Sequence, residues 1–278
     1  MQPSPPSERF RELAARLRAG DASVGLAHAA LVLAGEFQPS LDSEAAVAEL
    51  DRLGAAAARA VAPAGPLAVR TARLVDFMRS SGFRGNDERW DDPRNSFLNE
   101  VLARRTGIPI TLAIVTIEVA ARAGLELRGV SFPAHFLVRT ADEPPIVIDA
   151  FHGRLIDERE CAARLVQALG EGARFDPSRL APARTSEIVV RMLANLKHGY
   201  AGRSDWLATL LCCERILLVT PDAAGEIRDR GLLYEQLECF GPALADLERF
   251  VALAPRGPEA DALRGRIEAL RPKAAAIH

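Results

Sequence analysis

The segment from Ile108 to Ala121 constrains the fold most, because the helix that it predicts is apolar on nearly every face. Pro109 suits the first turn of this helix, where no amide hydrogen bond is lost. Two segments of strand-like composition, 134–140 and 146–150, follow on either side of the turn-forming residues Asp142-Glu-Pro-Pro145. This order predicts a buried helix that packs against a small sheet.

The first 80 residues predict helices, because apolar residues recur there every three or four positions. Phe10, Leu13 and Leu17 show this spacing. The segment 82–95 is polar, contains glycines and a proline, and predicts a loop. We therefore expect a domain over 1–183 with a helical part (1–80) and an α+β core (81–183).

From about Thr185 the sequence predicts helices only, and part of it repeats. Cys213-Glu-Arg-Ile-Leu-Leu-Val-Thr-Pro221 matches Leu247-Glu-Arg-Phe-Val-Ala-Leu-Ala-Pro255 at an offset of 34 residues (221 to 255). This offset is the period of tetratricopeptide repeats. We expect repeats over 184–278, capped by a final helix from Glu259 to Leu270. The alternative is a plain helical bundle whose matching segments agree by accident.

Composition argues against several function classes. The formal net charge is −2, so the basic excess typical of nucleic-acid binding is missing and we expect no nucleic-acid partner. The first nine residues contain no apolar signal core, and the apolar segment 108–121 is shorter than a membrane span. We expect a cytoplasmic protein without a membrane partner. No phosphate-loop, dinucleotide or metal-ligand spacing occurs, so no cofactor and no metal are expected.

The apolar helix, His135 and Asp149 stand in the order of a cysteine-protease or transglutaminase half-site. In such a site a cysteine at the start of the helix attacks the acyl group, a histidine transfers protons, and an aspartate fixes the histidine tautomer. His135 and Asp149, each in a strand-like segment, suit the last two roles. No cysteine precedes Cys161, and Thr111 carries the hydroxyl nearest to the expected position.

Thr111 is a poor replacement for this cysteine, because its hydroxyl is far harder to deprotonate than a thiol. Threonine nucleophiles use a terminal amine as their base, and Thr111 is internal. Cys161 lies in a predicted amphipathic helix, where a buried structural cysteine is the commoner case. Thr111, His135 and Asp149 therefore make a degenerate catalytic triad.

Four further residues are expected to line the same cleft: Trp90, Asn95, Asn99 and His152. Asn95 and Asn99 are four positions apart and would share one face of a helix. Each of the four also has a structural alternative. These are a loop anchor for Trp90, a helix N-cap for Asn95, a hydrogen bond to the turn 107–111 for Asn99, and a surface turn for His152.

Three segments together resemble the SirB-type bacterial family: Asn95-Ser-Phe-Leu-Asn-Glu-Val-Leu-Ala-Arg-Arg-Thr-Gly-Ile-Pro-Ile-Thr-Leu112, Val130-Ser-Phe-Pro-Ala-His-Phe-Leu-Val-Arg139 and Ile148-Asp-Ala-Phe151. The resemblance covers nearly the whole chain. It implies a papain/transglutaminase-like core followed by tetratricopeptide repeats, in a cytoplasmic bacterial protein. It implies little about activity. The chain departs from the family at Ala150, where a proline would be expected.

Three functions are compatible with these observations. The favoured hypothesis is a non-catalytic protein that binds a protein or peptide partner through its cleft and its repeats. The alternative is an enzyme for acyl transfer or amide hydrolysis that uses Thr111, His135 and Asp149, or the histidine and aspartate for another hydrolytic step. The third hypothesis, a regulator whose cleft binds a small molecule, has no named ligand. The sequence leaves the oligomeric state open.

Overall fold

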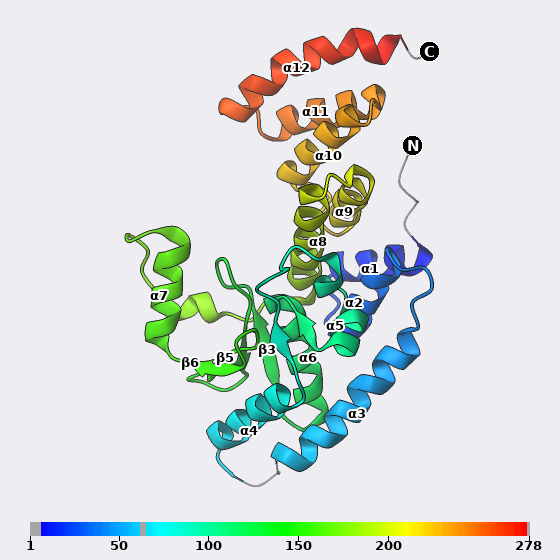
Figure 1. Cartoon of the computed structure of the whole chain (residues 1–278). Helices are drawn as coiled ribbons and strands as arrows, with labels where there is room; N and C mark the ends of the chain where they lie inside the picture. The colour runs from blue at the N-terminus through cyan, green and yellow to red at the C-terminus, as the bar shows by residue number, and fades with distance from the viewer. Residues whose placement is uncertain (1–6, 62–64, 277–278) are drawn as a thin grey trace. The chain divides into compact units, whose positions relative to one another are not determined.

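A computed structural model describes residues 7–61 and 65–276 (Figure 1). The chain forms two compact units. One is Ala22–Met192, and the other joins the described residues up to Asp21 with those from Leu193 onward. Across the described ranges, no helix is long and apolar enough to cross a membrane. The predicted α+β class is confirmed.

The unit Ala22–Met192 combines helices with two small sheets. Its helices are α2 (Leu26–Gly35), α3 (Ser43–Val61), α4 (Leu67–Ser80), α5 (Leu98–Arg104), α6 (Pro109–Arg122), α7 (Glu158–Leu169), the first part of α8 (Thr185–Gly202), and the 3₁₀ helices η1 (Pro93–Ser96) and η2 (Pro177–Leu180). Its strands are β1 (Arg84–Gly85), β2 (Thr106–Gly107), β3 (Leu127–Val130), β4 (Leu137–Thr140), β5 (Val147–Asp149) and β6 (Arg154–Ile156).

The larger sheet is antiparallel throughout, with the strand order β3-β4-β5-β6. Val138 pairs with Ile148, which in turn pairs with Leu155. The strands expected over 134–140 and 146–150 are present in shortened form, and β6 has no counterpart among the predicted strands. Because Asp149 is the last residue of β5, its side chain lies at the end of the sheet.

Helix α6 is the buried helix that the sequence predicts, and it contacts β3 and β4 (Figure 1). Pro109 is its first residue, as expected. Its one acidic residue, Glu118, contacts a second helix. Glu118 Oε1 accepts a 2.8 Å hydrogen bond from the backbone N–H of Ala27, in the first turn of α2. That N–H has no partner within its own helix, so the contact joins α6 to α2.

The second unit contains the rest of α8 and the helices α9 (Trp206–Val219), α10 (Ala224–Gln236), α11 (Phe240–Leu253) and α12 (Pro258–Ala275). Its backbone repeats with the predicted period. Ser204 and Glu238, 34 residues apart (204 to 238), both adopt a left-handed conformation, with φ of 57° and 58°. The C-caps Thr220 and Ala254 show the same offset, with φ/ψ of −127°/78° and −129°/72°. The bundle with accidental matches does not account for this agreement.

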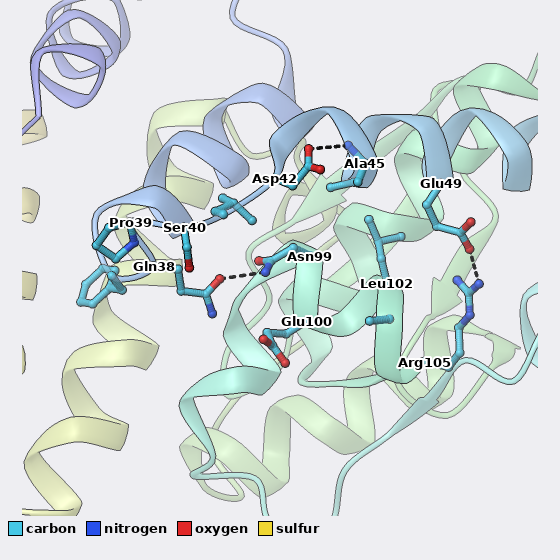
Figure 2. Close-up of a pocket in the computed structure, with 14 residues that line it drawn as sticks. Gln38, Pro39, Ser40, Asp42, Ala45, Glu49, Asn99, Glu100, Leu102 and Arg105 are labelled. Carbon is cyan, nitrogen blue, oxygen red and sulfur yellow. Dashed lines mark hydrogen bonds and ion pairs between the residues drawn. The ribbon is translucent and has the colours of Figure 1, made fainter.

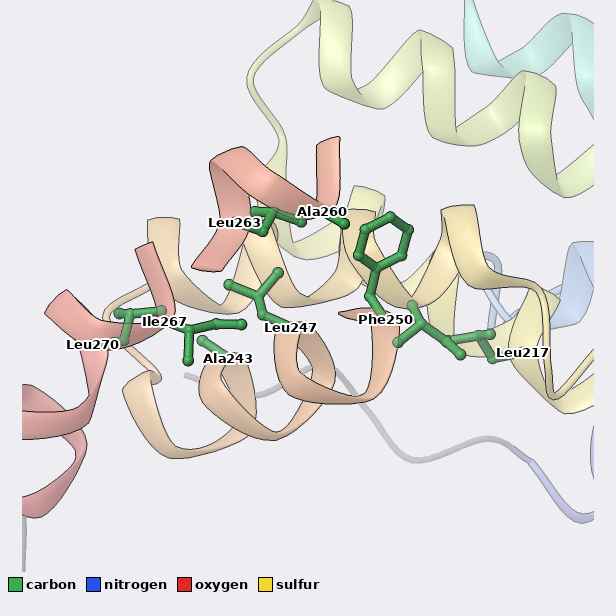
Figure 3. Packing of buried hydrophobic residues seen from close by; sticks show 9 residues of the cluster. Leu217, Ala243, Leu247, Phe250, Ala260, Leu263, Ile267 and Leu270 are labelled. Atoms are coloured by element: carbon green, nitrogen blue, oxygen red, sulfur yellow. The ribbon is translucent and has the colours of Figure 1, made fainter. Parts of the chain in front are cut away.

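The last helix covers the apolar face of the second repeat. Figure 3 shows side chains of α11 and α12 interdigitating in one cluster, which includes Ala243, Leu247, Phe250, Leu263 and Ile267. Burial of this face supplies the hydrophobic stabilisation that a terminal repeat lacks on its open side. The expected capping role of the segment 259–270 agrees with this packing.

Helix α1 (Glu8–Arg18) contacts α9 and belongs to the same unit as the repeats. Its apolar face is fully used, since Phe10, Leu13 and Leu17 are all buried. Ser7 accepts a hydrogen bond from the N–H of Phe10 and caps the helix. The domain limits expected from the sequence, 1–183 and 184–278, stay a prediction.

Candidate functional site

Asp149 is the centre of a cluster of polar groups at the end of β5. Its Oδ1 accepts hydrogen bonds of 3.1 Å from His135 Nε2 and from the backbone N–H groups of Phe151 and His152. Its Oδ2 lies 2.7 Å from His152 Nδ1 and also accepts from Arg164 of α7. Five donors therefore surround a carboxylate that is completely buried. The predicted pairing of His135 with Asp149 is present.

These contacts set the charge of the site. Burial by itself would raise the pKa of Asp149, but hydrogen bonds from His135 and His152 and the charges of His135 and Arg164 hold that pKa well below its usual range. Asp149 is therefore ionised at neutral pH and accepts the proton that His135 carries on Nε2. The ring nitrogen of His135 that remains for another partner is Nδ1.

His135 does not lie in a strand, as the sequence had suggested, but in a turn two residues before β4. Its backbone N–H donates to the carbonyl of Phe132 at 3.2 Å, and Ala134 adopts a left-handed conformation with φ of 55°. A non-glycine residue in this region is strained by roughly 1–2 kcal/mol. From this turn the imidazole reaches the carboxylate of Asp149 at the end of β5.

Arg191 of α8 holds this turn in place. Its guanidinium donates to Ser131 Oγ at 2.8 Å, to the carbonyl of Phe132 at 3.0 Å and to the carbonyl of His135 at 2.8 Å. The same side chain lies over the ring of Phe136, with Cζ 5.6 Å from the ring centroid. A fork of N–H donors on three acceptors fixes the backbone before and at His135.

Thr111 is the third residue of α6, near the start of the helix as the half-site requires. Its side chain is fully buried, and no group in the described residues forms a hydrogen bond with its Oγ1. The hydroxyl is thus neither paired with His135 nor reachable by a substrate in this structure. An attacking group needs a base within hydrogen-bond reach and access to the acyl carbon, and Thr111 has neither.

Cys161 is a core residue of α7. It is completely buried in an apolar cluster with Val130, Leu137 and Leu165. Burial raises the pKa of its thiol to about 11, so the reactive thiolate is scarce at neutral pH. This environment is that of a structural cysteine.

Asn95 is also completely buried, in a network inside the loop that the sequence predicts over 82–95. Its side-chain amide donates to the carbonyl of Arg89 at 2.6 Å, and its Oδ1 accepts from Asn86 at 3.1 Å and from Arg104 at 3.3 Å. It lies in η1, and the N-cap of the following helix α5 is Phe97, so Asn95 is not the cap of that helix. Trp90, in the same loop, is 57% exposed.

Asn99 lines a groove of about 720 Å³ between the α2–α3 connection and α5. Figure 2 shows the Asn99–Gln38 hydrogen bond (2.7 Å) toward one end, the Glu49–Arg105 ion pair toward the other, and Leu102 between them. Trp90, Asn95 and His152 are not among the described residues that line this groove. Their expected role as lining of a common cleft stays a prediction.

One group of described side chains has the chemistry to hold a cofactor ion. His135, Asp149 and His152 each offer a ligand atom, and these atoms all lie within 4.8 Å of one another. His152 is expected to line the cleft, and the structure brings it onto the same carboxylate as His135. A histidine three residues after an aspartate at a strand end is the local signal for this contact. For Arg164 and Arg191 the sequence carries no such signal.

Comparison with known proteins places these features in a family context. Residues 44–194 match the transglutaminase-like superfamily, and residues 196–268 match the tetratricopeptide repeat. A UPF0162 protein of Xylella fastidiosa is 44% identical over 191 residues, which cover 67% of this chain and 68% of that protein. No solved structure matches the chain at a significant level.

Two further relatives come from other bacteria. A UPF0162 protein of Pseudomonas aeruginosa is 31% identical over 247 residues, which cover 89% of this chain and 91% of that protein. The protein SirB1 of Salmonella typhimurium is 30% identical over 184 residues, or 66% of this chain and 68% of that protein. The similarity to the Pseudomonas protein thus extends over both compact units.

Proposed function

Since the chain belongs to the SirB-type family, whose members join a transglutaminase-like domain to tetratricopeptide repeats, we propose that it binds a protein partner and does not transfer acyl groups. The observation that carries the proposal is the state of Thr111. Its hydroxyl is buried, unpaired among the described residues and not bonded to His135. A buried hydroxyl with no bonded base is a poor nucleophile, and this supports a role without acyl transfer.

The groove between the α2–α3 connection and α5, which Asn99 lines, supports binding of an extended peptide segment. Its wall contains apolar side chains such as Leu41 and Leu102, and its polar residues include Asp42, Glu49 and Glu100. Among the described residues that line the groove, Arg105 is the one cation and it pairs with Glu49, so Asp42 and Glu100 have no cationic partner in this lining. A segment with an apolar residue next to lysine or arginine is complementary to this lining.

The repeats support a second contact with a protein partner. Ion pairs join successive first helices of the repeats: Lys197 of α8 reaches Glu226 at 2.7 Å and Asp229 at 3.0 Å, and Arg228 of α10 reaches Glu259 at 2.7 Å. Repeats held together in this way form a continuous surface, which is the usual basis of protein recognition by tetratricopeptide repeats.

The experiment uses peptides selected by phage display against the whole chain, with affinity measured by fluorescence anisotropy. We expect selected peptides to carry an apolar residue flanked by basic ones. Glu100→Lys should weaken their binding at least tenfold, because it reverses a charge of the groove. Glu171→Lys is the matched control, since Glu171 is exposed in a turn outside the groove. Equal binding by the two variants would contradict the role of the groove.

A second candidate function is hydrolysis in which His135 activates water. The observation that favours it is the His135–Asp149 pair, with an ionised Asp149 and a His135 side chain that is 14% exposed. An activity screen over amide and ester substrates tests it. Loss of turnover in His135→Ala, with full turnover in Thr111→Val, would favour hydrolysis over binding alone.

A further inference from the structure

We propose that His135, Asp149 and His152 bind a divalent transition-metal ion. The two imidazoles approach the same carboxylate from different parts of the chain, at 3.1 Å from His135 Nε2 to Oδ1 and at 2.7 Å from His152 Nδ1 to Oδ2. All three ligand atoms lie within 4.8 Å of one another. This inference goes beyond partner binding and does not depend on it.

The donor set selects the class of ion. Two imidazole nitrogens and one carboxylate suit zinc, iron(II), cobalt(II) or nickel(II), whereas magnesium and calcium prefer sites made of oxygen alone. Three protein ligands leave coordination positions for water. His152 is 46% exposed, so ions and water reach the cluster from its side.

An ion would replace the two ring protons that now lie between the imidazoles and the carboxylate. Each neutral imidazole then carries its proton on the opposite nitrogen, Nδ1 for His135 and Nε2 for His152, and turns a lone pair to the metal. Asp149 supplies the carboxylate ligand, whose two oxygens lie 3.1 Å from His135 Nε2 and 2.7 Å from His152 Nδ1.

The remaining contacts of Asp149 suit the surroundings of a metal site. The backbone N–H groups of Phe151 and His152 stay on Oδ1, and Arg164 stays on Oδ2. The two backbone donors orient the ligating carboxylate. Arg191 holds the turn that carries His135, so the first ligand is positioned before the ion arrives.

Arg164 also opposes the ion, because its positive charge lies on the ligating carboxylate. This opposition gives the proposal a sharp consequence. Removal of the charge in Arg164→Gln should tighten metal binding, whereas an accidental surface site for the ion would not respond to it. The sign follows from charge alone, since Arg164→Gln removes a cation next to the bound ion.

The test is titration of the untagged full chain with Co²⁺, followed by visible d–d absorption, and with Zn²⁺ by calorimetry. We expect one equivalent to bind, with binding at least about tenfold weaker in His152→Gln and measurably tighter in Arg164→Gln. His28→Gln is the matched control, since His28 is an exposed histidine of α2 outside the cluster. Circular dichroism checks that each variant is folded.

Two results would overturn the proposal. One is the absence of saturable Co²⁺ and Zn²⁺ binding by the wild-type chain. The other is equal binding by His152→Gln and His28→Gln, which would place the ion elsewhere. Because His152 lies in an exposed turn, His152→Gln is expected to fold even if Asp149 variants do not.

Discussion

Asp149 of the core and Asp246 of the second repeat are both buried carboxylates that pair with an arginine, yet their surroundings differ. Arg230 binds Asp246 with two hydrogen bonds, at 2.6 and 2.7 Å, and both side chains belong to adjacent helices. Asp149 instead gathers donors from the turn before β4, the turn after β5 and α7. Asp246 forms a pair with one arginine, whereas Asp149 brings together side chains from three separate segments.

The first repeat shows which residues can stand at the positions of Arg230 and Asp246, whereas Asp149 has no repeated counterpart. At an offset of 34 residues (196 to 230 and 212 to 246), Leu196 and Cys212 occupy the places of Arg230 and Asp246. Both are completely buried. The same helix pair therefore contains an ion pair in the second repeat and an apolar pair in the first. This indicates that an apolar pair can replace Arg230 and Asp246 without loss of the repeat.

A second exchange between the repeats follows the same logic. Gly231 lies against Leu247, and a Cβ at Gly231 would come within 2.8 Å of Leu247 Cδ2. The corresponding residues of the first repeat are Lys197 and Cys213. A smaller partner leaves space for the stem of Lys197, whose ammonium reaches Glu226. The packing of the two helices thus depends on pairing a large side chain with a small one, and either position can hold the large one.

The largest effect is expected at Asp149. Asp149→Ala leaves Arg164 and two backbone N–H groups buried without their acceptor, so the free energy of unfolding should fall by about 3–5 kcal/mol. Urea denaturation measures it. Asp157→Ala removes a carboxylate that caps α7 and should cost about 1 kcal/mol. Equal losses in the two variants would remove the distinction between a site and a local contact.

The acid dependence of stability tests the same carboxylate. The pKa of Asp149 is lowered in the folded chain, so its stabilising contribution is complete above the unfolded-state pKa of about 4. The contribution is lost as the pH falls from there toward the folded-state value. Urea midpoints between pH 2 and 7 should therefore fall less steeply in Asp149→Asn than in the wild type. Parallel profiles would contradict an ionised Asp149.

Asp246→Ala should have a smaller effect, about 2 kcal/mol, because Arg230 is left partly exposed and retains some solvent. The double variant Arg230→Leu with Asp246→Cys copies the first repeat and should lie within about 1 kcal/mol of the wild type. Thermal and urea denaturation give both values. A double variant less stable than Asp246→Ala would show that the second repeat requires its ion pair.

Gly231→Ala should destabilise the chain by about 1–3 kcal/mol, since the added methyl group overlaps Leu247. Addition of Leu247→Cys, the pairing of the first repeat, should relieve the overlap. A double-mutant cycle then yields a favourable coupling of at least about 0.5 kcal/mol. Additive losses would mean that the two positions do not compensate one another.

The smallest effect is expected for Thr111→Val, within about 1 kcal/mol, because the buried hydroxyl that it removes makes no hydrogen bond in the described residues. Thr116 of the same helix is the matched comparison. Its hydroxyl donates to the carbonyl of Leu112 at 2.8 Å, so Thr116→Val loses a bond. A large loss in Thr111→Val alone would show that this hydroxyl has an important partner.

The sequence predicted what depends on local pattern. The apolar run gives α6, the turn-forming residues separate β4 from β5, and the offset of 34 residues gives the repeats. Asp149 and His135 could be chosen because order along the chain sets which elements can meet.

Contacts between residues far apart in the chain could not be predicted from local sequence pattern. Arg164 and Arg191 reach the site from helices that follow the sheet, and Asn99 finds its partner in Gln38, which precedes it by 61 residues. The strained turn at Ala134 moves His135 out of the expected strand. No helical or strand periodicity encodes such long-range pairs, because they depend on tertiary packing.

The most direct test of partner binding without acyl transfer is mass spectrometry of a phage-selected peptide after long incubation with the chain. We expect the peptide and the protein to keep their masses, and the peptide to bind wild type and Thr111→Val with the same Kd. A peptide that is cleaved, joined or attached to the wild-type chain, and left intact by Thr111→Val, would contradict the account.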